Sequence, residues 1–389
     1  MKILFCLLGE TGHINPYIGP AQALIAQGHD VLVTSPADLS ERMKKSGIPF
    51  SKDLLAPEGM APKGKDLVAM VEDKKQHRAM IEDFFLKGIS AQVGHFKEFI
   101  KKEKPTAVIV DPMNYPAVIA AHLLVIPWIS ISSSLTSVIP DSLNSDVLEL
   151  LRLVAPVREK IFQEFSFSPK FRAIDCLSPL LNITFATEEF IGDTHDDVTL
   201  VGPSVALHER GDEVSLKSLP SDRPIIYASF GSQVYYYPEL FKKIQSACET
   251  LPVHLVMSIG ELAHEEGWQD QEAVSLYPYA PQLEILKKAS LFITHGGANS
   301  VMESLRAGVP MLINPLCNDQ EHQAYFVEKS GVGKKINLKE ISVEDLRSHI
   351  LTLLTNQNIK ERTQEVSQSY QVNGSTKVAD LITSTLASL

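Results

Sequence analysis

One stretch of the chain, residues 294–304, has an unusual density of groups that could bind a ligand: THGGANSVMES. The run before it, ASLFIT, is apolar and partly β-branched, which is typical of a strand, and the run after it, LRAGVPMLINP, indicates a helix end and another strand. Residues 294–304 therefore lie where a strand becomes a helix. A helix N-terminus leaves backbone N–H groups unpaired and carries partial positive charge, so it is a natural site for a phosphate.

The side chains of this stretch suit the same ligand. The adjacent glycines have no Cβ, so a ligand can approach their backbone closely. Asn299 and Ser300 can cap the helix and donate to phosphate oxygens, and His295 can donate to a diphosphate. Glu303 lies one helical turn after Asn299, where its carboxylate can accept hydrogen bonds from ribose hydroxyls. Taken alone, the stretch is equally compatible with a structural turn.

Further polar groups follow strands in the same half of the chain. INPLCNDQ (313–320) ends with Asp319 and Gln320, an acid and an amide that suit the hydroxyls of a sugar. YASFGSQ (227–233) leads from a strand into a loop whose Ser232 can reach a phosphate. Open α/β sheets bind ligands at the carboxyl ends of their strands. With YAPQLEIL upstream as a platform for a base, these groups predict a nucleotide-sugar site.

The bulk composition narrows the class of protein. The net charge of −11, from 36 basic and 47 acidic residues, argues against a nucleic-acid binder, which would normally carry a basic surface. The four cysteines are scattered without paired spacing, which favours a reducing compartment over a disulfide framework or a zinc site. The apolar N-terminal run is too short for a signal peptide, and no run is long enough to cross a membrane. We therefore expect a cytoplasmic protein without a transmembrane segment.

Apolar runs alternate with helical segments in both halves of the chain. In the first half KILFCLL, HDVLVTS, TAVIVDP and PWISISS read as strands, and PYIGPAQALIAQG reads as a helix closed by Gly28. Strands that are apolar throughout predict parallel sheets covered on both faces. The pattern restarts near residue 222 with PIIYASFG, VHLVMSIG, SLFITH and VPMLINP as strands. The sequence therefore predicts an α/β protein with two Rossmann-like doubly wound domains.

The predicted boundaries follow from local composition. Residues 1–206 form the first domain, the polar segment 207–222 a linker, and residues 223–372 the second domain. Residues 373–389 form an amphipathic helix, which we expect to pack back on the first domain. The segment 141–175 interrupts the α/β pattern with helical sequence, and it either shapes a binding cleft or packs against the sheet.

At this point the chain resembles a known family. The span 279–320, from YAPQLEIL to PLCNDQ, is similar to the signature of the UDP-dependent, family-one glycosyltransferases, and GHINPYIGPAQALIAQGHDV (12–31) is similar to their N-terminal opening. The resemblance implies the GT-B architecture, in which two facing Rossmann-like domains enclose a cleft. Within the family, the chain looks most like the bacterial macrolide and zeaxanthin glycosyltransferase-like group. The first domain would then bind the acceptor, with residues 55–100 and 141–175 shaping its pocket, and the second domain would bind the nucleotide-sugar.

The resemblance also implies roles for individual residues. Those of the second domain would contact uracil, diphosphate, ribose and sugar in turn: Tyr279, Ala280 and Gln282; then His295, Gly297, Asn299 and Ser300; then Glu303; then Asp319 and Gln320. The common family pattern has Trp where Tyr279 stands. A Tyr can still stack on a base, but the choice between UDP and TDP stays open. The final Gln fits glucose better than galactose.

Sugar transfer also needs an activated acceptor hydroxyl. His13 follows the first strand in the loop GETGH, so we expect a neutral imidazole facing the cleft as the general base. Asp111 ends the strand TAVIVD, where it can stabilise the imidazolium that forms, and family members pair a His and an Asp in this way. A capping Asp before Pro112 and a structural His are the alternatives. The ligand loops contain no Asp-x-Asp motif, so UDP would leave toward the helix N-terminus and His295 without a metal or another cofactor.

The leading hypothesis is an inverting, metal-independent hexosyltransferase. It would move glucose from a UDP-sugar to a hydroxyl of a small hydrophobic acceptor such as a polyketide, terpenoid or phenol. One alternative is a sugar-nucleotide epimerase, which would not need a base at the N-terminal Gly-His position. The other is a helper protein that binds nucleotide-sugar for another glycosyltransferase, which the presence of His13 and of the set in 295–320 disfavours. The acceptor, the sugar and the oligomeric state stay open.

Overall fold

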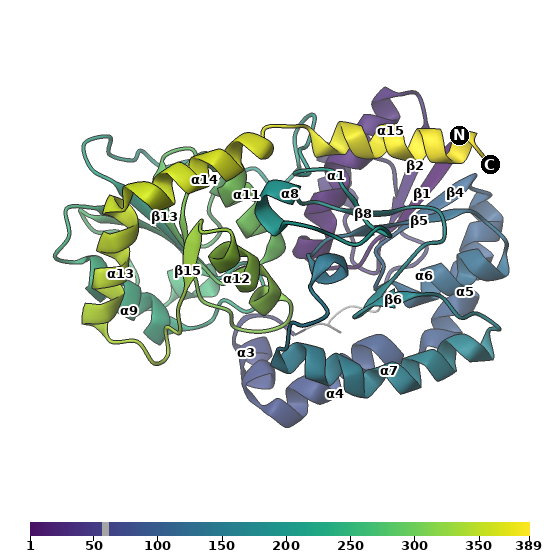
Figure 1. Ribbon diagram of the computed structural model, residues 1–389, viewed down its shortest axis with the longest axis horizontal. Coiled ribbons are helices and arrows are strands. Elements are labelled where there is room, and N and C mark those ends of the chain that lie inside the picture. The colour runs from purple at the N-terminus through teal and green to yellow at the C-terminus, as the bar shows by residue number, and fades with distance from the viewer. Residues whose placement is uncertain (57–61) are drawn as a thin grey trace.

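Two lobes, each built around a parallel β-sheet, make up the computed structural model, which describes residues 1–56 and 62–389 (Figure 1). The predicted strands form because their apolar side chains are buried on both sides of each sheet. The third predicted strand is the clearest case, since every residue of Ala107–Val110 is fully buried. The predicted α/β fold with two doubly wound domains is confirmed.

The first lobe carries a sheet whose strands are β1 (Lys2–Cys6), β2 (Asp30–Thr34), β3 (Phe50–Ser51), β4 (Ala107–Val110), β5 (Trp128–Ser132), β8 (Asn182–Thr184) and β9 (Thr199–Leu200). They lie in the order β3-β2-β1-β4-β5-β8-β9, and β1 pairs in parallel with both β2 and β4. The helices of this lobe are α1 (Thr11–Ala26), α2 (Ser40–Lys45), α3 (Gly64–Glu72), α4 (Lys74–Leu86), α5 (Ile89–Glu103), α6 (Tyr115–Leu123), α7 (Asp146–Glu164) and α8 (Glu188–Ile191). The hairpin of β6 (Phe171–Arg172) and β7 (Asp175–Cys176) lies outside the sheet.

The second lobe repeats the same winding. Its strands are β10 (Ile225–Ser229), β11 (His254–Ser258), β12 (Val274–Tyr277), β13 (Ala289–Thr294), β14 (Met311–Ile313) and β15 (Gly333–Lys335). Their order is β12-β11-β10-β13-β14-β15. The helices are α9 (Pro238–Cys248), α10 (Gln282–Leu286), α11 (Ala298–Ala307), α12 (Gln320–Lys329), α13 (Val343–Thr355), α14 (Gln357–Ser369) and α15 (Gly374–Ala387), with a 3₁₀ turn η2 (Gly260–His264).

The winding determines where ligands can bind. In each sheet the chain runs outward in one direction and then returns to the other side, so β1 lies beside β4 and β10 beside β13. Open α/β sheets bind ligands at this switch point, beyond the carboxyl ends of the strands. The loops after β1, β4, β10 and β13 therefore come to the middle of their lobes.

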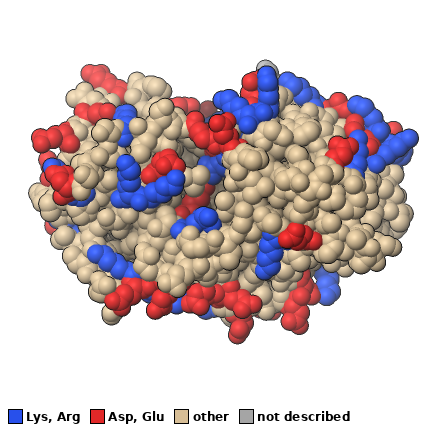
Figure 2. Space-filling model, turned by 90° about the horizontal axis from the view of Figure 1, so that it is seen from above, with Lys and Arg blue, Asp and Glu red and all other residues tan. Residues whose placement is uncertain are grey.

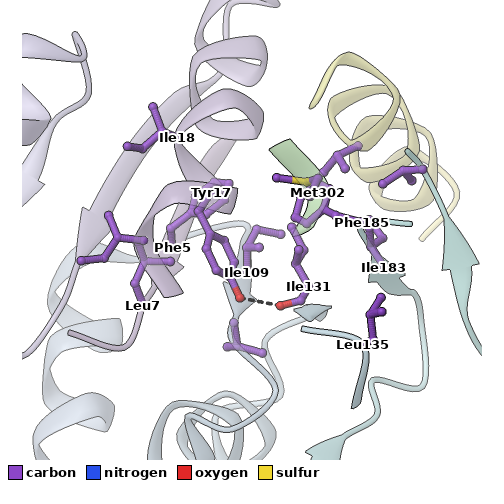
Figure 3. Close-up of a cluster of buried hydrophobic side chains, with 14 of the residues drawn as sticks. Phe5, Leu7, Tyr17, Ile18, Ile109, Ile131, Leu135, Ile183, Phe185 and Met302 are labelled. Atoms are coloured by element: carbon purple, nitrogen blue, oxygen red, sulfur yellow. Dashed lines mark hydrogen bonds between the residues drawn. The ribbon is translucent and has the colours of Figure 1, made fainter. Parts of the chain in front are cut away.

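The apolar core continues from one lobe toward the other. Figure 3 shows Phe5 and Ile109 of the first sheet packed near Ile131 and Tyr17, and Met302 of α11 lies beside Phe185 in the same cluster. Tyr17 is fully buried and donates its hydroxyl hydrogen to the carbonyl of Ile131. The lobes thus share apolar surface in addition to the covalent linker.

Two prolines in α1 leave carbonyl groups free for contacts outside the helix. Pro16 and Pro20 have no N–H, so the carbonyls four residues earlier, on Gly12 and Pro16, receive no helical hydrogen bond from them. Ser204 Oγ donates to the Pro16 carbonyl at 2.7 Å, and the Gly12 carbonyl accepts a hydrogen bond from the second lobe, described below. α1 also begins at Thr11, earlier than predicted, so His13 lies in its first turn and not in a loop.

The chain crosses between the lobes at two places that lie side by side. The first crossing follows β9, and the second precedes α15, where Gly374 N donates to the Pro203 carbonyl at 3.0 Å. Ser375 Oγ accepts from Val205 N at 2.9 Å. Beyond this point α15 lies along α1 (Figure 1), and Gln27 Nε2 donates to Asp380 at 2.7 Å.

The helix α3, although it belongs to the first 206 residues, packs on the second lobe. α3 buries Leu67 and Val71 in the core around Leu338, and Glu72 forms an ion pair of 2.6 Å with Lys339. α3, α4 and α7 run along one side of the molecule in Figure 1. They contain parts of the expected acceptor wall, although residues 57–61 of the 55–100 segment lie outside the described ranges.

The surface shows no preference for one sign of charge on the face in Figure 2, where basic and acidic side chains are interspersed on both sides of a notch between the lobes. This mixture agrees with the acidic net charge of −11 and offers no extended basic patch on that face. Among the helices within residues 1–56 and 62–389, none combines the length and the apolar character needed to span a membrane.

Candidate active site between the lobes

His13 and Asp111 meet at the switch point of the first sheet. Asp111 follows β4 and is buried, and its Oδ2 lies 2.7 Å from Nδ1 of His13. Ser133, directly after β5, places Oγ 2.7 Å from the same Nδ1 and donates to Asp111 Oδ2 at 3.2 Å. Because Nδ1–H donates to the carboxylate, Nε2 is the ring atom left for proton exchange. Within the described ranges no residue bonds to this Nε2.

The charge on His13 is set by its neighbours. Burial lowers its pKa, but the charge and hydrogen bond of Asp111, with the charges of Glu10 and Asp319, outweigh burial and raise the pKa to about 9. In the ligand-free protein the imidazole therefore holds a proton at neutral pH, as an ion pair with Asp111. This differs from the neutral imidazole predicted from sequence, and the close carboxylate is the reason. The same carboxylate stabilises the cation that forms when His13 accepts a proton.

A second buried carboxylate lies behind this pair. Asp175, in β7, accepts a hydrogen bond from Ser132 Oγ at 2.6 Å. Burial raises the pKa of Asp175 to about 7, against the opposing effect of the Ser132 hydrogen bond. Sequence analysis missed Asp175 and Ser133. Ser133 carried the signal that identified Asp111, a polar residue after an apolar strand, whereas the short hairpin around Asp175 carried none.

In the second lobe, His295 occupies the turn between β13 and α11. Its Nδ1 is buried and has no hydrogen-bond partner in the part of the chain that the structure describes. Burial lowers the His295 pKa to about 4, so the ring is neutral at physiological pH. A Cβ at Gly231 or Gly297 would lie within 2.7 Å of its Nε2, so glycine at both positions makes room for the ring. A buried polar atom without a partner is rare, and it is expected where a ligand supplies the missing bond.

The N-cap of α11 lies two residues before Asn299, the first of its predicted cap residues. Its N-cap is Gly297, so Asn299 and Ser300 lie in the first turn, and a glycine cap leaves the first-turn N–H groups without a side-chain acceptor. Asn299 Nδ2 donates to the Gly12 carbonyl at 3.1 Å, the carbonyl that Pro16 leaves free. Because Gly12 precedes His13, this bond brings the N-terminus of α11 against the first turn of α1.

A small cavity of about 20 Å³ lies between the lobes at this place. Ser133 and Phe185 line it from the first lobe, and Asn299 and Met302 line it from the second. The groups after β5 and at the start of α11 thus face a common space. The structure brings His13, Asp111 and the start of α11 together across the cleft.

Glu303 lies on the inner face of α11 but already has partners. Its Oε2 accepts from Gln282 Nε2 at 2.7 Å, and its Oε1 accepts from Arg210 Nη1 at 2.7 Å. Gln282 also contacts Ser300 Oγ at 3.3 Å, so three of the predicted donor-site residues form one cluster. Arg210 was not identified from sequence, because the linker that carries it has no periodic pattern.

Tyr279 and Ala280 lie at the base end of this cluster. The Tyr279 hydroxyl donates to Asp212 Oδ2 at 2.9 Å, while its side chain stays partly exposed. Ala280 is buried, and its N–H donates to Ser258 Oγ at 3.3 Å. Ser232 follows Gly231 after β10 and is exposed. These residues border the carboxyl ends of β10, β11 and β12, as a base platform would.

Asp319 and Gln320 differ from each other in orientation. Asp319 is close enough to His13 for its charge to raise the His13 pKa, and burial raises the pKa of Asp319 itself. Gln320 turns back into its own loop, where its Oε1 accepts from Leu316 N at 2.7 Å and Cys317 N at 3.1 Å. The predicted sugar role of Gln320 is therefore not visible in this conformation, because its acceptor oxygen holds the loop.

Comparisons with known proteins agree with this geometry. Residues 206–373 match the family model described as UDP-glucoronosyl and UDP-glucosyl transferase, and residues 3–130 match the glycosyltransferase family 28 N-terminal domain. The chain is 28% identical to the NDP-glycosyltransferase YjiC of Bacillus subtilis, over 93% of this chain and 91% of that protein. It is 25% identical to the oleandomycin glycosyltransferase of Streptomyces antibioticus, over 96% and 88%.

Solved structures show the same fold. The glycotransferase of kitacinnamycin superposes with a TM-score of 0.76 at 23% identity, covering 99% of this chain and 98% of that one. Matches to glycosyltransferase models in both lobes, relatives of similar length and a shared two-domain fold all agree. The chain therefore belongs to the bacterial family-one glycosyltransferases and has their GT-B fold.

Proposed function

We propose that the protein transfers glucose, with inversion at the anomeric carbon, from UDP-glucose to a hydroxyl of a small hydrophobic acceptor. His13 is the general base and Asp111 its partner. The observation that carries the proposal is the 2.7 Å contact between His13 Nδ1 and Asp111 Oδ2, which leaves Nε2 free beside the start of α11. General-base catalysis of this kind contributes about 10²–10⁴-fold to a rate.

The departing diphosphate would be stabilised by the second lobe. The first-turn N–H groups of α11 and the unpartnered Nδ1 of His295 point to an anion at this place. Because these donors are fixed by the fold, they need little rearrangement as negative charge develops on the leaving group. We propose that they take the place of a metal ion, so that transfer proceeds without a divalent cation.

The acceptor class is inferred from two sources. The oleandomycin glycosyltransferase, which is similar over nearly the whole chain, acts on a natural product according to its name. The cavity between the lobes is lined by apolar groups such as Phe185 and Met302 beside the Ser133 hydroxyl. We propose that the lobes move apart to admit a hydrophobic acceptor with a hydroxyl group, such as a polyketide, terpenoid or phenol, against this lining.

The donor half is tested by thermal-shift titration with UDP, TDP and their glucose conjugates. A ligand that binds only the folded state raises its stability. We expect UDP-glucose to stabilise the wild type and the shift to be lost in Glu303→Ala, because the ribose hydroxyls lose their acceptor. If TDP-glucose alone stabilises the protein, the UDP assignment is wrong. If no nucleotide does so at millimolar concentration, the donor site is not functional.

The catalytic half is tested by release of UDP with a panel of hydroxylated acceptors. His13→Ala should lower the rate of release by about 10²–10⁴-fold, and His264→Ala, which replaces an exposed histidine in η2, should not change it. Addition of EDTA should leave the rate unchanged. If the protein binds UDP-glucose but transfers to no acceptor of the panel, the helper-protein alternative is favoured.

A further inference from the structure

Part of the linker, residues 207–213, lies between the lobes, and we call it the linker arm. Its anchors are in the first lobe. Gln22 of α1 accepts from Leu207 N at 2.8 Å and donates to the Glu209 carbonyl at 3.0 Å. Arg42 of α2 forms an ion pair of 3.1 Å with Asp212. The arm is therefore held at a defined place and does not trail freely.

From these anchors the arm reaches the donor cluster of the second lobe. Arg210 binds Glu303 through Nη1 and Asp212 through Nε, both at 2.7 Å, and Asp212 accepts from Tyr279. The Arg210 and Glu303 side chains are only 16% and 7% exposed. Glu303 and Tyr279, which are expected to contact the ribose and the base, are thus already bonded to side chains of the linker arm.

We propose that the linker arm is a latch over the ribose and base end of the donor site, and that a ribonucleoside diphosphate displaces it on binding. This inference rests on the proposed function, which assigns Glu303 to the ribose and Tyr279 to the base. Each Glu303 oxygen has one partner, Arg210 on Oε1 and Gln282 on Oε2. The vicinal hydroxyls of a ribose need those same oxygens, and the carboxylate is almost entirely covered.

The latch has two energetic consequences. The donor binds only the fraction of molecules in which the arm has moved away, so its apparent affinity is lower than its intrinsic affinity by that fraction. The arm is also tied to Gln22 and Arg42, so a donor that releases it removes one contact between the lobes. Arg210 is therefore a residue that sets donor affinity without belonging to the predicted donor set.

The test measures UDP affinity by isothermal titration calorimetry in the wild type, Arg210→Gln and Asp212→Asn. Arg223→Gln is the matched control, because Arg223 directly follows the linker and, among the described residues, forms its ion pair with its exposed neighbour Asp222 alone. We expect the Kd for UDP to fall about 5- to 10-fold in Arg210→Gln and to fall also in Asp212→Asn, as the latched fraction decreases. Arg223→Gln should match the wild type. An unchanged or higher Kd in both latch variants, with UDP binding to the wild type, overturns the latch and leaves the proposed function intact.

Hydrogen exchange supplies a second readout. Backbone amides of residues 207–213 should exchange faster in Arg210→Gln and in wild type saturated with UDP, and they should be unchanged in Arg223→Gln. If UDP binds the wild type without altering exchange in the arm, the arm is not displaced and the latch is overturned. If neither the wild type nor any variant binds UDP or TDP, the proposed function itself fails, and the latch fails with it.

Discussion

The two lobes hold their functional groups in opposite ways. In the first lobe His13, Asp111 and Ser133 bond to one another, and all three lie beyond the carboxyl ends of strands at a single sheet edge. In the second lobe Gln282, Ser300 and Glu303 bond to one another, but other contacts of the candidate donor groups go to protein outside the donor set. Glu303 is paired with the linker, Gln320 with its own loop, and His295 Nδ1 has no partner within the described residues.

This difference teaches which half is preorganised. The catalytic pair already has the geometry that proton transfer needs, so little must move there. The donor site must break contacts within the protein before it can contact the nucleotide. Its affinity for the nucleotide is therefore lowered by the free energy that those broken contacts contribute. Turnover and nucleotide binding should therefore respond separately to mutation and to pH.

Loss of the general base should give the largest effect, and it should lower turnover without changing nucleotide binding. Replacing His13 by Ala should lower kcat by about 10²–10⁴-fold, because the acceptor hydroxyl no longer has a base. UDP affinity should stay close to the wild-type value. Steady-state UDP release and calorimetry measure the two quantities. A parallel loss of UDP affinity would contradict the assignment of catalysis to the first lobe and of nucleotide binding to the second.

The next largest effect is expected in the pH dependence of turnover, which reports on the first lobe. The pKa of His13 is raised from 6.5 to about 9, so the neutral base accumulates as pH rises, and kcat/KM should climb until about pH 9. In Asp111→Asn the carboxylate charge is absent, so the climb should shift to lower pH, with a lower plateau because the ring loses its oriented partner. A rate that is flat between pH 6 and 9 would contradict the assignment of His13.

The same ion pair makes a prediction about stability. A raised folded-state pKa means that the pair stabilises the protein fully below the ordinary value of 6.5, and that this contribution is lost as pH rises through about 9. The difference in free energy of unfolding between the wild type and Asp111→Asn should therefore shrink from pH 6 to pH 10. Urea denaturation at both pH values measures it.

A smaller effect is expected at the diphosphate. Replacing His295 by Phe keeps a ring but removes the donor, and UDP affinity should fall about tenfold, the scale of one hydrogen bond. Because burial lowers the His295 pKa to about 4, the ring does not titrate near neutrality. Because a terminal phosphate loses its last proton at about pH 6, UDP binding to the wild type should be insensitive to pH between about 7 and 8.5, unlike turnover. Calorimetry at three pH values tests this, and unchanged UDP affinity in His295→Phe would remove His295 from the site.

The smallest effect concerns the loop that Gln320 holds. Gln320→Ala should lower the free energy of unfolding by about 1 kcal/mol, because two loop N–H groups lose their acceptor. Gln320→Glu keeps an acceptor oxygen and should lose less. Urea denaturation compares the two. If both variants are as stable as the wild type but lose discrimination between UDP-glucose and UDP-galactose, the side chain serves the sugar and not the loop.

Much of the fold and the meeting of His13 with Asp111 could be predicted from the sequence. Continuous apolar runs identify strands that are buried on both faces, and parallel strands bring their carboxyl ends to one edge. A polar residue directly after such a run is therefore expected in the segment that leaves this edge of the sheet. This rule led to Asp111 and His295, and it would also have found Ser133, whereas His13 and Asp319 lie several residues further along the segments that follow their strands.

The rest depended on contacts that no local pattern encodes. The protonation of His13 follows from the distances of surrounding carboxylates, which come from separate segments. Arg210 reaches Glu303 across 93 residues, from a linker whose composition predicts only that it is polar. α3 packs on the second lobe although its sequence lies within the predicted first domain, because apolar helix faces do not specify which core they join.

The paired crossings between the lobes have a mechanical consequence. The two crossing segments are joined by the hydrogen bonds from Gly374 to Pro203 and from Val205 to Ser375, so they form one double connection between the lobes. A single tether would let the lobes twist and translate freely, but a double one permits mainly rotation about a fixed axis through it. α3 lies away from that axis in Figure 1 and is packed on the second lobe, so the contact between its Glu72 and Lys339 is expected to move with that lobe. The cleft would then open and close by a hinge motion, which returns His13 and α11 to the same alignment after each cycle.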